Sequence, residues 1–298
     1  MQTAVIHSSV FNSSMLKDYA SLTKPRIGFM VLVSTSIGYF LGAGSLEPFP
    51  KLLFTLLGTF LCVAGSAVLN NFLERDFDKK MKRTAGRALP SGRITPASAL
   101  SFGTTLVLCG TIILVVQVNL LTGFLALLSA FLYVLVYTPL KRITWLNTMI
   151  GAIPGALPPV GGWAAATGDI SLGALALFLI MFIWQHPHFY SIAWLYRNDY
   201  RDGGFQMLPS VDTTGGRTAR HIMLFSLALL PASLLPTIIG MSGVVYGCGA
   251  FGLSLYMLYA GYVFISKWDE LSARGLLHAS LLYLPLVLLL AVVDATVI

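Results

Sequence analysis

A run of amides and carboxylates, directly after an apolar segment, is the part of this sequence best suited to chemistry. Asn70, Glu74 and Asp78 recur every four residues, so on a helix they share one face, with Asn71 beside them. Oxygen ligands converging on one face suit a hard divalent metal such as Mg²⁺. Several lysines and arginines follow closely along the chain and suit a phosphate-type anion carried by that metal. The spacing therefore predicts a metal and phosphate site.

The alternative interpretation of this run is an ordinary charged loop at a membrane edge. Topology explains its lysines and arginines without any function, but it does not explain the face of amides and acids. Paired asparagines facing lipid are unfavourable and add nothing to anchoring. Asp76 lies on a different face of the helix, and we interpret it as part of an ordinary charged segment at the membrane edge.

Two further polar clusters lie at the ends of later apolar segments. Asp199 and Asp202 precede a Gly-Gly pair, and we expect Asp199 to face Asp78 across the bundle; solvated acids in a helix-ending turn are the alternative. Lys141 and Arg142 suit a cationic clamp for a diphosphate, since arginine supplies a bidentate fork. A simple anchor at the membrane boundary explains that pair equally well.

Two histidines lie within an apolar segment, in the run Gln185-His186-Pro187-His188. Polar groups inside a bilayer need partners. His186 and His188 could ligate haem iron, transfer protons or hydrogen-bond a substrate. Packing against backbone groups freed by Pro187 is the alternative, and the sequence alone leaves this choice open.

The composition indicates an integral membrane protein. Of 298 residues, 56% are hydrophobic and 10% charged, and the mean hydropathy is +0.79. Soluble domains carry about 25% charged residues. The three cysteines all lie in apolar runs, without zinc or disulfide spacing. The net charge of +7 reflects membrane topology, as its placement shows, and we expect no nucleic-acid partner.

Nine apolar segments have the length of about 17–25 residues that a membrane helix needs. Only a short break around Asn119 separates the third from the fourth, so the count could also be eight or ten. We therefore predict an all-α polytopic bundle of about nine transmembrane helices, forming one domain over residues 1–298. The second and sixth segments both end in an acidic cluster, and this weak similarity predicts two pseudo-repeated halves. Prolines in the fifth segment should kink it, and its freed backbone groups then need partners. The segments are 27–44, 52–72, 98–117, 120–138, 145–165, 171–195, 221–240, 244–266 and 276–296.

Positive charge fixes the expected orientation. With nine helices, 18 of the 19 lysines and arginines fall on one side, and only Lys51 falls on the other. The positive-inside rule makes that side cytoplasmic and places the C-terminus outside. We expect residues 1–20 to form a cytoplasmic tail and see no cleavable signal peptide. The site-bearing loops are then cytoplasmic too.

Together these motifs resemble the UbiA-type intramembrane prenyltransferases, and within them the protohaem IX farnesyltransferase branch. The family motif Asn-Asp-x-x-Asp-x-x-x-Asp, with Asn second in the haem branch, corresponds to residues 70–78. The resemblance covers most of the chain, and the segment around the two histidines is its most specific part. Matching segments are Leu22-Thr23-Lys24-Pro25-Arg26, Met81-Lys82-Arg83-Thr84, Arg87-Ala88-Leu89-Pro90-Ser91-Gly92-Arg93-Ile94, Tyr137-Thr138-Pro139-Leu140-Lys141-Arg142, Trp184-Gln185-His186-Pro187-His188-Phe189, Asp199-Tyr200 and Met207-Leu208-Pro209.

Two positions depart from that family pattern. Glu74 stands where the family usually has Asp, so its carboxylate is one methylene longer. After Asp199-Tyr200 the usual Ala-Gly-Ile-Pro-like run is replaced by residues 201–206, which leaves Asp202 without a family counterpart.

The resemblance implies transfer of farnesyl from farnesyl diphosphate to a vinyl group of haem B, with addition of water, in the inner membrane of a bacterial cell. It also implies association with haem A synthase or oxidase assembly proteins. His188 and His186 are the implied haem contacts, and Asp78, Glu74, Asn70 and Asp199 the implied catalytic residues. The implied Mg²⁺ ligands are Asn70, Asn71, Glu74, Asp78 and Asp199, and the implied diphosphate contacts are Lys141, Arg142, Arg83 and Lys24.

Three other functions fit parts of the sequence. One is a UbiA-type enzyme that prenylates an aromatic acid, a quinone precursor or a chlorophyllide, against which the histidine segment speaks. The second is a secondary transporter, although transporter sites lie near the bilayer midplane. The third is a non-catalytic haem-binding assembly factor.

Overall fold

The computed structural model describes residues 13–297, which form helices and loops with no strand in that range. Eight helical segments are long and apolar enough to cross a membrane, and α7 adds a ninth long helix among them. The predicted all-α membrane bundle is therefore confirmed. The helices are α1 (Ser13–Leu22), α2 (Pro25–Ala43), α3 (Phe49–Asp78), α4 (Pro96–Gln117), α5 (Leu120–Phe131), the π-helical segment η1 (Leu132–Tyr137), α6 (Thr138–Leu140), α7 (Asn147–Thr167), α8 (Leu172–Leu195), α9 (Arg197–Asp202), α10 (Leu208–Val211), α11 (Gly216–Ile238), α12 (Val244–Lys267) and α13 (Glu270–Val297).

The predicted N-terminal tail over residues 1–20 is described only in its second part. Residues 1–12 lie outside the described range, while α1 begins at Ser13 and continues to Leu22. The side chain of Leu22 is buried in a small apolar cluster with Val68 and Leu89. The second part of the predicted tail is thus a helix packed beside α3.

The length of α3 explains how polar residues come to lie at its end. The helix has 30 residues, and at 1.5 Å per residue it spans about 45 Å. A hydrocarbon core is only about 30 Å thick. The apolar run therefore fills the membrane layer, and the last turns carry their amides and acids beyond it.

Asn119 separates α4 from α5. Its side chain accepts a hydrogen bond from the Thr122 backbone N–H at 2.8 Å and so begins the new helix. Its Nδ2 donates to the carbonyl oxygen of Ala164 at 2.9 Å. Asn119 thus caps the start of α5 and also links it to α7.

Helix α7 remains one helix over Asn147–Thr167 despite three internal prolines. Pro158 cannot donate to the carbonyl of Pro154, and Ser129 Oγ donates to that oxygen instead, at 3.3 Å. The predicted need for partners inside the bundle is met here by a side chain of α5. At Gly162 a Cβ would lie 1.9 Å from the Thr35 carbonyl oxygen, so glycine lets α2 pack directly on α7.

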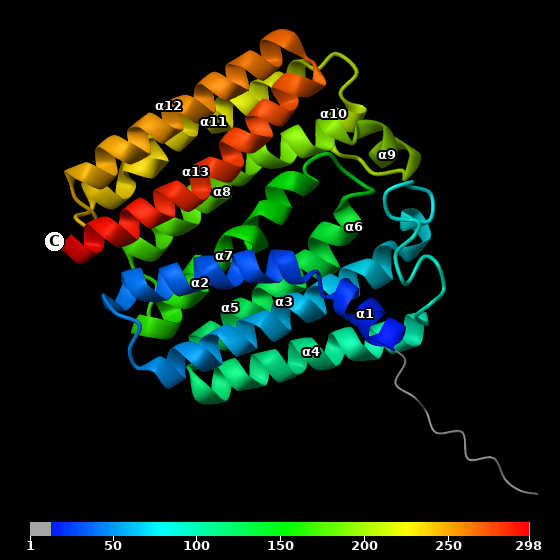
Figure 1. The fold of residues 1–298 in the computed structure, drawn as a ribbon, viewed down its shortest axis with the longest axis horizontal. Coiled ribbons are helices and arrows are strands. Elements are labelled where there is room, and N and C mark those ends of the chain that lie inside the picture. The colour runs from blue at the N-terminus through cyan, green and yellow to red at the C-terminus, as the bar shows by residue number, and fades with distance from the viewer. Residues whose placement is uncertain (1–12, 298) are drawn as a thin grey trace, which may run out of the picture.

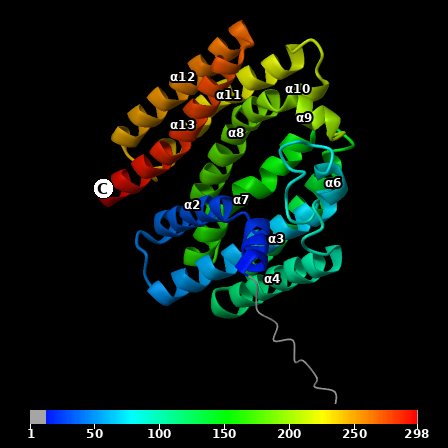
Figure 2. The same ribbon diagram turned by 45° about the vertical axis from the view of Figure 1, so that its right-hand side comes forward.

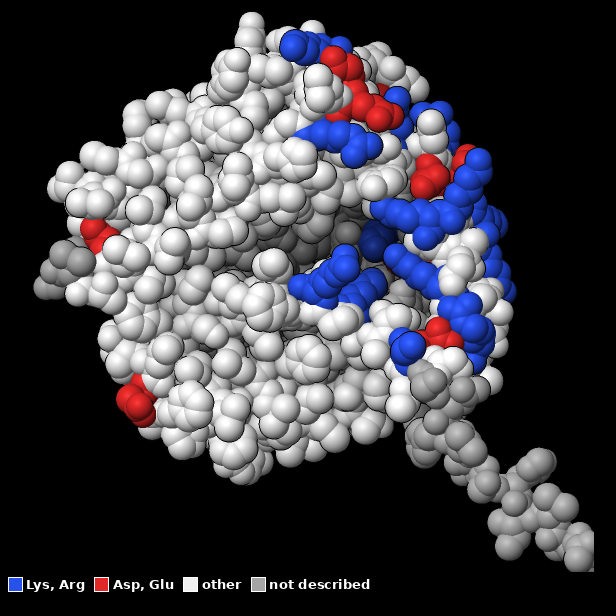
Figure 3. Space-filling model, viewed as in Figure 1, with Lys and Arg blue, Asp and Glu red and all other residues white. Residues whose placement is uncertain are grey.

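The helices gather into two groups, which Figures 1 and 2 show from two sides. One group contains α2 to α7, and the other contains α8 with α11, α12 and α13. The short helices α6, α9 and α10 and the C-terminal end of α3 meet at one end of the bundle (Figure 1). Lysines and arginines are concentrated at that end, which we call the basic end (Figure 3).

Candidate functional site

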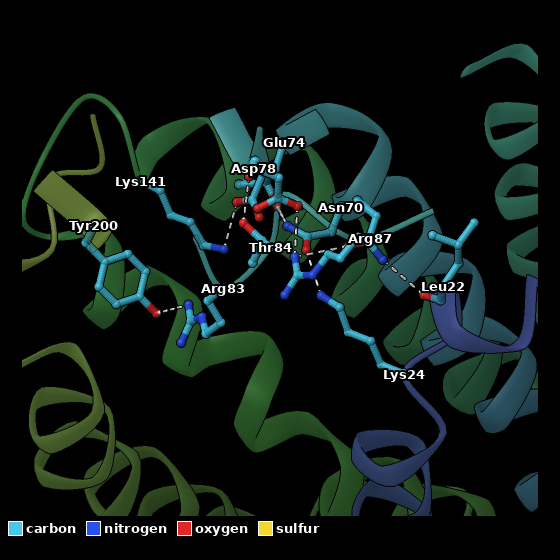
Figure 4. Close-up of polar contacts among 12 residues, drawn as sticks. Leu22, Lys24, Asn70, Glu74, Asp78, Arg83, Thr84, Arg87, Lys141 and Tyr200 are labelled. Carbon is cyan, nitrogen blue, oxygen red and sulfur yellow. Dashed lines mark hydrogen bonds and ion pairs between the residues drawn. The ribbon is translucent and has the colours of Figure 1, made fainter. Parts of the chain in front are cut away.

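The predicted polar face of α3 is present and is buried. Asn70, Asn71, Glu74 and Asp78 have only 1%, 3%, 6% and 1% of their surface exposed, although they lie at the end of the bundle. The close-up in Figure 4 shows Asn70, Glu74 and Asp78 along this helix, with basic side chains reaching toward them. Asp76 points elsewhere: its side chain is 61% exposed and pairs with Arg75 and Lys79.

Each buried carboxylate has one cationic partner. Lys141 Nζ lies 2.8 Å from Glu74 Oε1, and Arg87 Nη1 lies 2.8 Å from Asp78 Oδ2. Burial acts to lower the pKa of Lys141, but the charge of Glu74 and neighbouring tyrosines outweigh it and hold that pKa well above its usual value. The other oxygen of Asp78, Oδ1, is buried and has no hydrogen-bond partner.

The two asparagines are held by bonds that fix their amide orientation. Asn70 Oδ1 accepts from Lys24 Nζ at 3.0 Å, and its Nδ2 donates to Thr138 Oγ1 at 3.0 Å. Asn71 Nδ2 donates to the carbonyl oxygen of Leu22 at 3.1 Å. These bonds connect the end of α3 to the start of α2 and to α6.

Lys24 reaches this site through an unusual backbone conformation. It has φ 50°, which non-glycine residues rarely adopt, and it immediately precedes Pro25 at the start of α2. Strained residues of this kind cluster at functional sites. The conformation turns the chain sharply from α1 into α2 and leaves the Lys24 ammonium directed at Asn70 (Figure 4).

Two further arginines contact aromatic rings at the basic end. The guanidinium of Arg83 lies 4.4 Å from the ring centre of Tyr196, and that of Arg142 lies 4.4 Å from the ring centre of Phe77. Burial acts to lower the pKa of Arg83, and Tyr200, Tyr196 and Asp199 raise it above its usual value. Neither arginine is in an ion pair within residues 13–297, so both keep hydrogen-bond donors available for an anion.

Asp199 is not gathered into the same cluster. It lies partly buried on α9, and the described residues contain no group of three or more His, Cys, Asp or Glu side chains arranged to hold one metal ion. Four of the five predicted metal ligands share one face of α3, and the fifth, Asp199, belongs to α9. Asp202 ends α9 and is exposed.

An apolar cavity of about 340 Å³ adjoins this polar face. Lys24, Tyr137 and Thr148 line its polar part, and Val63, Leu125 and Leu157 line part of the remainder. Residues of α2, α3, α5, η1, α7 and α8 all contribute to its walls. The cavity therefore joins an anion-binding end to a space suited to a hydrocarbon chain.

Neither predicted histidine is among the residues that line this cavity. Gln185 and Phe189 of α8 do line it, while His186 and His188 lie on other sides of that helix. Gln185 Nε2 donates to the carbonyl oxygen of Ala152 at 3.3 Å and so links α8 to α7.

Sequence reasoning missed Arg87 as a site residue, although the resemblance included its segment. Arg87 belongs to the irregular loop after α3, which folds back because Thr84 Oγ1 donates to the Asp78 carbonyl oxygen at 2.9 Å. Arg87 Nη1 then reaches both Asp78 and Asn71. A loop carries no periodicity from which such a return could be predicted.

Comparisons with known proteins agree with this architecture. A family model described as the UbiA prenyltransferase family matches residues 31–291. A protein of Solibacter usitatus (strain Ellin6076), named protoheme IX farnesyltransferase, is 47% identical over 288 residues, covering 94% of this chain and 99% of that protein.

Solved structures match the fold at low sequence identity. A structure from work on digeranylgeranylglyceryl phosphate synthase in membranes has a TM-score of 0.76 and 18% identity, covering 96% of this chain and 100% of the other. A UbiA homolog from Archaeoglobus fulgidus bound to DMAPP and Mg²⁺ has a TM-score of 0.65 and 16% identity, covering 94% and 100%. At these identities the likeness concerns the fold alone.

Proposed function

The chain belongs to the UbiA prenyltransferase family, and we propose that it transfers farnesyl from farnesyl diphosphate to a vinyl group of haem B. One water molecule is added, and the products are haem O and diphosphate. The identity of 47% to a protoheme IX farnesyltransferase over nearly the whole chain supports this acceptor. The observation that carries the chemistry is the buried acid face of α3 beside an apolar cavity.

The residues of the acid face fit a magnesium ion. Asp78 Oδ1 is buried without a partner, a position that is unfavourable unless a cation or donor occupies it. We propose that Glu74 and Asp78, with Asn70 and Asn71 beside them, hold Mg²⁺, and that Asp199 supplies a further carboxylate from α9. When bound, Mg²⁺ supplies positive charge that neutralises the leaving diphosphate.

The cations around this face are suited to bind the diphosphate. Lys141 and Arg87 already lie within 2.8 Å of the two carboxylates, and Lys24 lies at the cavity wall. Arg83 and Arg142 add guanidinium groups that can bind phosphate oxygens bidentately. These five side chains hold the anionic end of the substrate while its apolar chain extends into the cavity.

The reaction needs no protein nucleophile. The bond between farnesyl C1 and oxygen breaks, its electron pair leaves with the diphosphate, and an allylic cation remains. Tyr133, Tyr137 and Phe189 line the cavity and can stabilise that cation by cation–π attraction. The terminal vinyl carbon of haem B attacks C1, and water adds to the resulting cation beside the pyrrole ring and releases one proton. The apolar walls exclude water from the first cation.

We further propose that α8 contacts the haem through His188 or His186. The protein is an integral membrane protein, and the positive-inside rule supports a cytoplasmic basic end and an external C-terminus. We place it in the bacterial inner membrane, where association with haem A synthase or oxidase assembly proteins would pass on the apolar product.

The proposal is tested by incubating purified protein with farnesyl diphosphate and magnesium, with either haem B or 4-hydroxybenzoate as acceptor. We expect farnesylated haem and one diphosphate per product, with no prenylated benzoate. Asp78→Asn should abolish the formation of farnesylated haem and of diphosphate. Asp76→Asn is the matched control, because the Asp76 side chain is exposed on the same helix. Prenylated benzoate in place of farnesylated haem would contradict the proposed acceptor.

A further inference from the structure

The two histidines of α8 have different surroundings, and the difference bears on how haem B binds. This inference rests on the proposed function, since it concerns the same substrate. On a helix each residue advances by about 100°, so His186 and His188 point roughly 160° apart. They therefore cannot both face one porphyrin.

His186 is enclosed on all sides. Its exposure is 0%, its ring stacks on Phe225 with the ring centres 3.6 Å apart, and its Nδ1 lies 2.8 Å from the Phe182 carbonyl oxygen. A carbonyl oxygen only accepts, so Nδ1 carries the proton and donates. The remaining nitrogen, Nε2, is buried without a partner, in the core between α8 and α11. A porphyrin could not reach it without separating these helices.

The surroundings of His188 fix its tautomer. Its Nδ1 lies 2.8 Å from Ser280 Oγ, and Ser280 Oγ in turn donates to the Leu277 carbonyl oxygen at 2.6 Å. The single hydroxyl proton of Ser280 is thereby used, so the proton in the first bond must come from Nδ1 of His188. Nε2 of His188 then carries an unprotonated lone pair, and it has no hydrogen-bond partner among residues 13–297.

This is the arrangement that a metal-binding imidazole requires. Ligating histidines almost always donate their other ring N–H to a fixed acceptor, which sets the tautomer and the ring orientation. Here the acceptor itself is fixed, because Trp184 Nε1 donates to the Ser280 carbonyl oxygen at 2.8 Å. The His188 ring also stacks on Trp184, with the ring centres 4.9 Å apart and the planes 20° apart.

On α8, His188 lies between the side that lines the cavity, at Gln185, and the side that packs on α13, at Trp184. Helix α8 packs against α7 through Gln185, against α11 through His186 and against α13 through Trp184. His188 falls between the directions of Gln185 and Trp184 on the helix, and it is only partly buried. The cavity that Gln185 lines is also lined by Ile27 and Val31 of α2. Figure 3 shows a hollow on this face of the molecule, beside lysines and arginines of the basic end.

We propose that Nε2 of His188 ligates the iron of haem B, with the porphyrin seated in this hollow between α2 and the α8–α13 pair. The next residue, Phe189, lines the cavity assigned to the farnesyl chain, so the hollow and the cavity adjoin at α8. A vinyl edge can then face the allylic carbon while the propionates lie toward the basic end. His186 is a packing residue of the C-terminal helix group.

The test is haem binding by the full-length protein in detergent, measured by absorption and electron paramagnetic resonance with ferric haem B as the probe. We expect His188→Ala to change the spectrum and lower the affinity at least tenfold, and added imidazole to restore the spectrum. Ser280→Ala should lower the affinity about 10–100-fold, as loss of an orienting partner does. His186→Ala and the exposed His278→Ala are the matched controls and should keep the wild-type spectrum.

A second measurement needs no substitution. Wild-type protein grown with isotopically labelled histidine should show hyperfine coupling between the ferric iron and a histidine nitrogen. Absence of that coupling, or an unchanged spectrum in His188→Ala, overturns the ligand assignment. Failure of wild-type protein to form farnesylated haem instead overturns the proposed function, and the two failures are separately observable.

Discussion

Replacing Lys141 by methionine tests whether the acid face of α3 is held together by buried charge pairs. The Lys141 and Glu74 side chains are 14% and 8% exposed, and their charged atoms are 2.8 Å apart. Methionine keeps much of the length and apolar contact of lysine but removes the ammonium. The Glu74 carboxylate is then left buried without its cation.

The expected effect is large because a buried charge without a partner is strongly unfavourable. Removing one member of a buried ion pair typically lowers the free energy of unfolding by about 3–5 kcal/mol. The double variant Lys141→Met, Glu74→Gln should regain about 1–3 kcal/mol, since it no longer buries a charge. Lys79→Met is the control, because that lysine is 57% exposed and its surface pair contributes about 0–1 kcal/mol.

Magnesium should distinguish this protein's site from an ordinary ion pair. A ligand that binds only the native state stabilises it by about 2.7 kcal/mol at a concentration 100 times its dissociation constant. Since Lys141 competes with the metal for Glu74, Mg²⁺ should stabilise Lys141→Met more than the wild type. The assay is equilibrium unfolding in detergent with and without Mg²⁺. A loss below about 1 kcal/mol, or equal stabilisation of both proteins by Mg²⁺, would refute the reasoning.

Three further outcomes follow from named contacts. Arg87→Ala removes the charged partner of Asp78, a hydrogen bond of about 1.5–3 kcal/mol, so the KM for farnesyl diphosphate in a turnover assay should rise about 10–100-fold. Gly155→Ala would place a Cβ 2.0 Å from Gln185 Oε1, and unfolding should show a loss of about 1–3 kcal/mol. Because the folded-state pKa of Lys141 is raised, its pair is fully formed below the unfolded-state pKa of about 10.4 and is lost only above it. The difference in unfolding free energy between wild type and Lys141→Met should therefore be equal at about pH 7 and about pH 9.

Each of these outcomes has a contrary result and a control. An unchanged KM in Arg87→Ala would remove that residue from the diphosphate site. Gly252→Ala is the control for the glycine variant, since a Cβ there meets nothing within 4 Å, and similar stability of both variants would refute the packing argument. A difference that shrinks between the two pH values would show that Lys141 loses its proton earlier than the geometry requires.

The membrane helices could be predicted closely from hydropathy, because length and apolar content suffice to define a span. The predicted segment 171–195 is α8 at Leu172–Leu195, and the predicted segment 244–266 is α12 at Val244–Lys267. Features that depend on local hydrogen bonding were not predicted. The π-helical segment η1, which carries Tyr137 toward the cavity just before Lys141, has no pattern that separates it from an α-helix.

In the candidate site too, the features set by one helix could be predicted, and those set by loops and helix packing could not. Helical periodicity predicted that Asn70, Glu74 and Asp78 share a face, since that depends only on α3 itself. It could not predict the return of Arg87 along an irregular loop, nor the position of Asp199 relative to the acid face, because both depend on loop conformation. The different surroundings of the two histidines likewise depend on which helices pack beside α8.

The most direct test of the proposed function is mass spectrometry of the haem product formed from haem B and farnesyl diphosphate in water enriched in heavy oxygen. The mechanism predicts a farnesylated haem whose new hydroxyl carries the heavy oxygen. It also predicts that the diphosphate is unlabelled, because only the bond between farnesyl carbon and oxygen breaks. Absence of farnesylated haem would contradict the assigned function, and an unlabelled hydroxyl would contradict the addition of water to the haem-bound cation.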